Sequence, residues 1–395
     1  MFEQIVLRRA ESGASISAGQ LAEAMLYYQR VHMVIDRGTL FNLVKQMGTE
    51  RLLTVLARDD VSAVYCDEIL GTHTESTAAS QYHNYVAISL AGGSDGEILK
   101  SAEARLRFDL KRDGLSLTQA HNFTTKFLSH VPLRTYSGDS FVKGGIPKAA
   151  TEDLRDTNFV LEAVRRALSA TDGGLPVPTN LKFEILESDL GRFVFTNIDF
   201  TEINKRRARQ SPTVEPLTAA HLLSSILEAR ADLALASYYG GDFVTSSTTS
   251  SIIQVRHAEI LRRSGLNFES RQQFSEIVLG NMPCLSETID SGERSFDDFL
   301  KLIDQATKFK KWLKSVSPDE NLVREYLQEL SKEGWLNRLH GKSIRYMLTT
   351  AASAVNPIAG LVAGFADTFL ADKISRGWKP NHFISSKLAP FVSKN

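Results

Sequence analysis

The order of strand and helix patterns between residues 28 and 90 restricts the fold of this chain more than any other feature. Residues 28–36 carry the apolar, β-branched run of a strand, whereas residues 39–57 repeat apolar side chains at three- and four-residue steps, as a helix does. Residues 61–65 and 85–90 return to strand patterns. Strand, helix and strand in succession are typical of helices covering a sheet, so a small sheet is predicted near the amino end.

A second strand pattern, the clearest in the chain, covers residues 181–200. Apolar residues alternate with polar ones on both sides of a turn at residues 188–191. This arrangement predicts a β-hairpin with one buried face. That face is predicted to hold Leu181, Phe183, Ile185, Phe193 and Phe195. The polar and charged residues 204–216 that follow are the predicted linker between two domains.

From residue 218 onward the periodicity is helical. An apolar stripe follows three- and four-residue steps through Ala219, Leu222, Ile226, Ala229, Leu233 and Ala236. The predicted fold is therefore α+β and predominantly helical. An N-terminal domain (residues 1–212) contains the small sheet and the hairpin, and a C-terminal domain (residues 213–395) forms a helical bundle.

Residues 346–366 contain no charged side chain and carry a G-x-x-x-G spacing at Gly360 and Gly364, which allows helices to approach closely. Their few strongly apolar residues contribute roughly −2 to −4 kcal/mol toward membrane insertion, and the polar residues oppose it. Pro357 also interrupts the segment. We therefore expect the segment to be buried in the helical domain, with Gly360 and Gly364 at helix contacts. Membrane contact on a trigger is the alternative.

Gly92-Gly93-Ser94-Asp95-Gly96 matches G-x-S-x-G between a predicted strand and a predicted helix, and Asp172 lies in a downstream Asp-Gly-Gly. This pair resembles the dyad of patatin-like lipases, and the resemblance implies Ser94 as nucleophile and Asp172 as its base. Residues 1–60 show no glycine-rich oxyanion loop, and Asp95 would place negative charge beside a developing oxyanion. The alternative interpretation is an ordinary loop between a strand and a helix.

Polar residues near the predicted strand ends form a further candidate set, comprising Asp36, Asp67, Glu68, His73 and His83. Carboxylates at strand ends can hold a divalent metal, but no pair has a diagnostic metal-ligand spacing, so a structural role is favoured.

Two basic clusters, residues 205–209 and 308–314, are candidates for contact with nucleic acid. The formal net charge of the chain is zero, which disfavours a nucleic-acid partner.

We predict that the protein is cytoplasmic. It has two cysteines in no metal-like spacing, and its amino terminus does not have the pattern of a secretory signal. No nucleotide- or cofactor-binding motif is present, and neither a metal nor a cofactor is predicted.

The leading hypothesis is a non-catalytic protein that acts by binding a protein partner or a second copy of itself. The alternatives are a conditional membrane effector acting through residues 346–366 and a serine hydrolase at Ser94.

Overall fold

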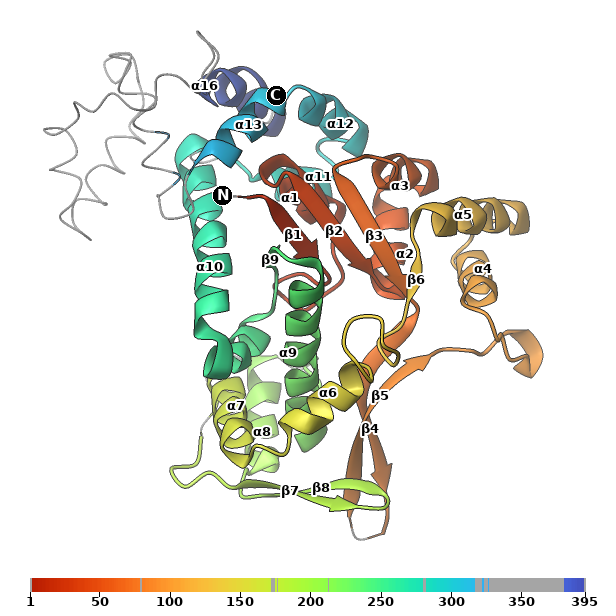
Figure 1. The fold of residues 1–395 in the computed structure, drawn as a ribbon, viewed down its shortest axis with the longest axis vertical. Coiled ribbons are helices and arrows are strands. Elements are labelled where there is room, and N and C mark those ends of the chain that lie inside the picture. Colours follow the sequence, from red (N-terminus) through yellow and green to blue (C-terminus); the bar gives the residue numbers. More distant parts are fainter. Residues whose placement is uncertain are drawn as a thin grey trace, which may run out of the picture. The chain divides into compact units, whose positions relative to one another are not determined.

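The computed structural model describes residues 2–78, 80–171, 175, 177–211, 213–279, 282–316, 322, 326 and 380–393 (Figure 1). The protein is α+β and predominantly helical, as the sequence predicts. Its residue contacts divide the chain into two compact units. We call the unit made of Gln4–Ser17 and Arg30–Ser264 the sheet unit, and the unit made of Met1–Glu3, Ala18–Gln29 and Gly265–Asn395 the helical unit.

A parallel sheet is the centre of the sheet unit. Its strands are β1 (Gln4–Leu7), β2 (Arg30–Ile35), β3 (Val61–Cys66), β6 (Leu133–Arg134) and β9 (Asp242–Phe243). They lie in the order β6-β3-β2-β1-β9, and every neighbouring pair is parallel. The small sheet predicted near the amino end is confirmed, because β2 and β3 coincide with two of the three strand patterns that predicted it. The third pattern, residues 85–90, belongs to a strand of the second sheet described below.

The helices of the sheet unit begin where side chains satisfy their first N–H groups. The Asp36 carboxylate accepts a hydrogen bond from the Thr39 N–H (2.7 Å) at the start of α2, and Ser116 with Gln119 forms a capping box on α5. The helices are α2 (Arg37–Met47), α3 (Thr49–Leu56), α4 (Ala102–Arg112), α5 (Leu117–His130), α6 (Ile146–Asp153), α7 (Thr157–Ala170), α8 (Phe200–Gln210) and α9 (Ala219–Tyr239). Helix α10 (Ser247–Leu279) follows and is kinked at His257.

The main core of the sheet unit forms between the parallel sheet and helices α6, α7 and α9. Val6, Val34 and Val64 on neighbouring strands belong to one buried cluster with Leu222 and Ile226 of α9. Burial of such aliphatic side chains contributes roughly 1.5–3 kcal/mol each. The stripe that predicted α9 is thus the side of the helix that packs into the core.

The predicted linker at residues 204–216 is wrong in its first half, because α8 runs to Gln210. Ile203 is the one buried residue of this helix, and none of its charged side chains is buried. Arg206 Nε lies 3.1 Å from Glu202 Oε1. A helix with a single buried residue has the composition of a linker, which explains the error.

A second, antiparallel sheet completes the sheet unit. It consists of β4 (Glu68–Ser76), β5 (Gln81–Ser89), β7 (Phe183–Ser188) and β8 (Gly191–Thr196), in the order β4-β5-β8-β7. Strands β4 and β5 form one long hairpin, and the hairpin β7–β8 lies beside it (Figure 1). The hairpin predicted at residues 181–200 is therefore present.

The helical unit contains α1 (Ala18–Tyr27), α11 (Leu285–Asp290), α12 (Phe296–Asp304), α13 (Thr307–Ser315), α16 (Pro380–Phe383), a π-helical turn (Ile384–Leu388) and α17 (Ala389–Val392). Aromatic rings fill its core. The Phe309 ring stacks on Phe383 with centroids 4.9 Å apart, and Phe274 meets Tyr326 edge-on at 5.2 Å.

None of the helices in the described part of the chain has both the length and the apolar character needed to cross a bilayer. The segment 346–366, with Gly360 and Gly364, lies outside the described residues, so its predicted helix contacts stay predictions. The domain boundary expected at residue 212 also stays a prediction about independent folding, although residues on both sides of it belong to the sheet unit.

Candidate interaction surface

The antiparallel sheet has one side that packs into the sheet unit. Leu70 on this inner face is buried. The Ser224 hydroxyl of α9 donates a hydrogen bond to Thr72 Oγ1 (2.8 Å), and the Tyr85 hydroxyl donates to the Leu223 carbonyl (2.8 Å). Because side chains alternate along a strand, the neighbours of these residues point to the opposite side, which we call the outer face.

The outer face carries apolar side chains on adjacent strands. Tyr82 of β5 is paired with Phe193 of β8, and Phe193 is paired with Leu186 of β7, so these three side chains form a row across the sheet. The Tyr82 and Phe193 rings lie 6.3 Å apart. At the other end of the β4–β5 hairpin, Ile69 is paired with Ile88. Such cross-strand apolar pairs are close neighbours on one face.

Four apolar side chains of the outer face are strongly exposed, whereas Tyr82 and Phe193 are partly buried. The exposed fraction is 54% for Leu186, 50% for Phe195, 51% for Ile88 and 42% for Ile69. Most of the large apolar side chains that are exposed among the described residues lie on this sheet or its adjoining loops. They are Ile69, Ile88, Leu90, Ile98, Leu186, Leu190 and Phe195. Single exposed apolar residues are common, whereas a group of them on one sheet face is typical of a binding surface.

Polar and charged side chains lie along the two borders of the outer face. His73 and Glu75 are exposed on the border strand β4, and their pairing partners on β5 are Asn84 and Tyr82. On the other border, Glu184 is exposed on β7 and is paired with Phe195, while Lys182 is exposed just before the strand. An apolar centre with a polar rim of both signs is the usual anatomy of a protein–protein interface.

The sequence predicted the wrong face for two of these residues. Phe193 and Phe195 were expected to be buried with Phe183 and Ile185, but Phe183 is paired with Thr196 and Ile185 with Val194. The phenylalanines of β8 therefore point away from the core. Counting across a two-residue turn would have revealed this, because such a turn pairs odd-numbered residues with even-numbered ones here.

Ser94, the candidate nucleophile, is exposed in a short 3₁₀ helix, η1 (Ser94–Gly96), in the loop after β5. Helix α4 begins only at Ala102, and β5 belongs to the antiparallel sheet, so the expected direct step from strand to helix is absent at this position. Asp172 lies outside the described residues. The Ser94–Asp172 dyad stays a prediction.

The predicted carboxylates lie after β2 and β3, where each has a protein partner. Asp36 is 3.0 Å from Arg9 Nη2, Asp67 accepts a hydrogen bond from Arg105 Nε (2.7 Å), and Glu68 accepts one from the Ser137 N–H (2.9 Å). Among the described residues no three side chains of histidine, cysteine, aspartate or glutamate are grouped as metal ligands. These partners support a structural role for the carboxylates.

The two predicted histidines lie on opposite faces of β4 and β5. His73 is on the outer face, as described above. His83 is buried on the inner face, 3.0 Å from Thr74 Oγ1, and burial lowers its pKa.

The basic clusters are on helices. Residues 205–209 lie on α8, and residues 308–314 lie on α13, where Phe309, Trp312 and Leu313 are buried. The lysines of α13 therefore lie on the sides of the helix that these buried residues do not occupy, as predicted for a solvated face.

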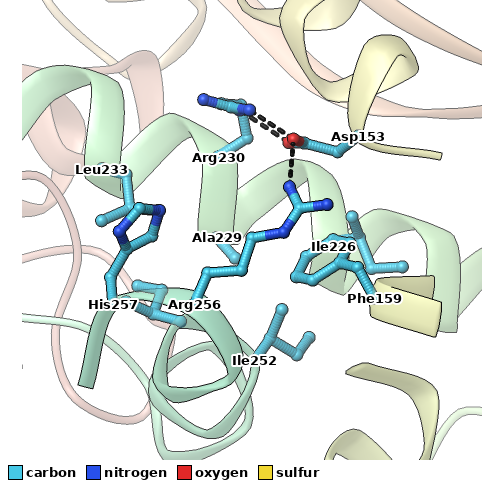
Figure 2. A pocket seen from close by; sticks show the side chains of 10 residues that line it. Asp153, Phe159, Ile226, Ala229, Arg230, Leu233, Ile252, Arg256 and His257 are labelled. Atoms are coloured by element: carbon cyan, nitrogen blue, oxygen red, sulfur yellow. Dashed lines mark hydrogen bonds and ion pairs between the residues drawn. The ribbon is translucent and has the colours of Figure 1, made fainter. Parts of the chain in front are cut away.

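A small cavity of about 20 Å³ lies beside the kink of α10 (Figure 2). Arg230 of α9 and Arg256 of α10 converge on the Asp153 carboxylate of α6, and the Arg256 guanidinium lies 3.8 Å from the centroid of the Phe159 ring. A cavity of this size admits a water molecule and no organic substrate. The ion pairs around it connect three helices.

Comparison of the chain with protein family models, curated proteins and solved structures finds no match.

Proposed function

We propose that this protein acts by binding a protein partner through the outer face of its antiparallel sheet. The observation that carries the proposal is the row Tyr82–Phe193–Leu186, with the half-exposed Phe195 beside it. Aromatic side chains are enriched at protein interfaces, where a few residues near the centre supply most of the binding free energy.

Magnitudes support a reversible interaction. Leu186 and Phe195 would each contribute on the order of 1 kcal/mol when a partner covers them, because half of their area is already buried, and the less exposed Tyr82 and Phe193 would contribute less. Association costs about 4–15 kcal/mol in lost translational and rotational freedom and side-chain ordering. The exposed apolar residues together therefore offset this cost only modestly, and the resulting complex would form and dissociate readily.

The cytoplasm is the compartment that we propose for this interaction. Cys66 and Cys284 are free thiols, which supports a reducing environment.

A photo-reactive amino acid tests the proposal. With benzoylphenylalanine at position 195, irradiation of cells that produce the protein should yield covalent adducts, because a bound partner would lie against this side chain. Position 117 is the matched control, since Leu117 is also exposed (69%) but lies on α5, away from the sheet. The absence of adducts at 195, or equal adducts at both positions, would refute the proposal.

A further inference from the structure

We infer that His83 is a pH-sensitive switch of the outer face, because its protonation separates the β7–β8 hairpin from the β4–β5 hairpin. The inference rests on the proposed function and adds the regulation of that surface. The row Tyr82–Phe193–Leu186 crosses from one hairpin to the other, so a change in the contact between the hairpins changes the surface itself.

The contact between the two hairpins is short. In the described part of the chain, β5 and β8 are paired at two positions, Tyr82 with Phe193 and His83 with Arg192. Within each hairpin the pairing runs along both strands. The Asn84 side chain also donates a hydrogen bond to a carbonyl in the turn between β7 and β8 (3.0 Å). The two hairpins are therefore joined by few groups, and one of them is a histidine.

His83 is buried at this contact in its neutral form. Its exposed fraction is 4%, and its Nδ1 lies 3.0 Å from Thr74 Oγ1 on β4. A hydroxyl can donate to the neutral ring or accept from it, so Nδ1 has a partner in either tautomer. Burial lowers the pKa of His83, because an imidazolium at this position would lose its hydration.

The charged side chains on the paired strands oppose a positive charge at His83. Paired residues point to the same side of a sheet, so Arg192 is the neighbour of His83 on the inner face. Arg192 Nε is buried and makes no hydrogen bond. On β7, Glu187 Oε1 lies 3.8 Å from this Nε, but Glu187 is 66% exposed, so solvent screens its charge. A protonated His83 would thus lie beside a cation that is only weakly compensated.

The other elements packed on the inner face supply no counter-ion. Tyr85, two residues along β5, stays neutral because burial raises its pKa. The Asp153 carboxylate of α6 acts on Tyr85, but two arginines already bind it. Helix α9 meets the sheet through the uncharged Leu223 and Ser224, and its His221 is 47% exposed. On α7, which packs against β7, exposed charged residues pair with one another, namely Glu162, Arg165 and Arg166.

Acid therefore weakens the contact between the hairpins. Once they separate, His83 is in water with its ordinary pKa of 6.5, whereas the joined hairpins keep its ring neutral. The stabilisation of the contact is complete above pH 6.5 and is lost as the pH falls below this value. The outer face is continuous at neutral pH and is divided between two hairpins in acid.

Residue-resolved amide hydrogen exchange of the purified full chain at pH 7.5 and pH 5.5, corrected for the intrinsic exchange rate, tests the inference. Protection of the amides of β5 and β8 that face each other should fall at pH 5.5 by up to about tenfold, the ratio set by the ordinary histidine pKa of 6.5. His83→Gln should abolish this pH dependence, because an amide does not titrate. His73→Gln, at an exposed position of the outer face, should retain it.

Arg192→Gln keeps the histidine and removes the neighbouring cation, so its protection should fall less, by about threefold. This variant also tests the inference if His83→Gln does not fold. Equal protection of the wild type at both pH values, or a loss that persists in His83→Gln, would overturn the inference. Because hydrogen exchange needs no partner, the proposed function would survive either result. No adduct at position 195 in the photo-crosslinking experiment would instead remove the proposed function and with it the regulatory role of His83.

Discussion

At the scale of single residues, Asp153 is the buried carboxylate on which two arginines converge beside the cavity of the sheet unit. Its carboxylate is 9% exposed, accepts a hydrogen bond from Arg230 Nε at 2.6 Å and lies 2.9 Å from Arg256 Nη1. Removing it leaves two partly buried guanidinium groups without their shared counter-ion. Arg256 keeps its second carboxylate partner, Asp156, at 2.7 Å, whereas Arg230 loses the carboxylate that its guanidinium contacts, which is unfavourable for a partly buried charge.

We expect Asp153→Ala to lower the free energy of unfolding by about 2–3 kcal/mol, measured by urea denaturation. Glu162→Ala on the neighbouring helix α7 is the control. Its ion pair with Arg166 has a similar length, 2.8 Å, but Glu162 is 39% exposed, so the loss should stay below about 0.5 kcal/mol. Equal losses in the two variants would show that burial does not determine the strength of the Asp153 contacts.

His32 makes the stability of the protein depend on pH. It is 7% exposed on β2, with Nδ1 2.7 Å from Ser62 Oγ and its ring stacked on Tyr239 at 3.6 Å. Burial lowers the pKa of His32 from 6.5 to about 4. Between pH 4 and pH 6.5 the His32 ring is protonated in the unfolded chain but remains neutral in the folded chain. The stabilisation is therefore complete above pH 6.5 and is lost as the pH falls toward 4.

At pH 5 the free energy of unfolding should be on the order of 2 kcal/mol lower than at pH 7.5 from this residue. Urea denaturation at the two pH values measures the difference. The free energy of unfolding should depend less steeply on pH in His32→Gln, because the amide does not titrate in this range. His73→Gln, at an exposed position of the outer face, is the control. An unchanged slope in His32→Gln would contradict the assignment.

At the scale of elements, the contact between α1 and α11 depends on a residue without a side chain. The Gly19 N–H donates a hydrogen bond to Asp290 Oδ1 (2.8 Å), and a Cβ on Gly19 would lie 2.2 Å from the Ser286 carbonyl oxygen. Any larger residue at position 19 would have to push the two helices of the helical unit apart.

We therefore expect Gly19→Ala to lower the free energy of unfolding by about 1–3 kcal/mol and to speed amide hydrogen exchange in α1 and α11. Gly265→Ala is the matched control, since Gly265 is also helical and a Cβ there has no atom within 4 Å. That substitution should be neutral or stabilising by up to about 1 kcal/mol. A loss of stability at position 265 equal to that at 19 would point to a general effect of the added methyl group.

Helices and strands that are specified by residues close together in the sequence were predictable. The strands β2 and β3, the capping box of α5, the core stripe of α9 and the presence of the β7–β8 hairpin follow from local periodicity and capping. Helix α8 was missed because it buries only Ile203. The facing of the β7–β8 hairpin was wrong because it depends on how two strands pair across the turn.

At the scale of the whole molecule, neither compact unit is one continuous piece of chain. The helical unit takes Ala18–Gln29 from between two strands of the parallel sheet and joins it to residues after Ser264. The composition of the chain predicted one boundary between two domains, near residue 212, because composition changes only between segments that are neighbours in the sequence. Contacts between residues more than 250 positions apart leave no such trace.

The candidate surface shows the same limit. The sequence placed Ser94, Asp172, Gly360 and Gly364 on the list of functional candidates, and these rested on short motifs. The outer face was not among them, since its members come from β4, β5, β7 and β8, and only strand pairing brings them together.

By itself the sequence determined the fold class, the presence of a small sheet and a hairpin, and the core stripe of α9, because side-chain periodicity acts within a few residues. The tertiary structure alone decided which side of each strand meets the core, which carboxylates are neutralised by arginines and where apolar side chains gather in solvent. Those outcomes depend on the register between distant strands and on packing between distant helices, and no local pattern encodes either.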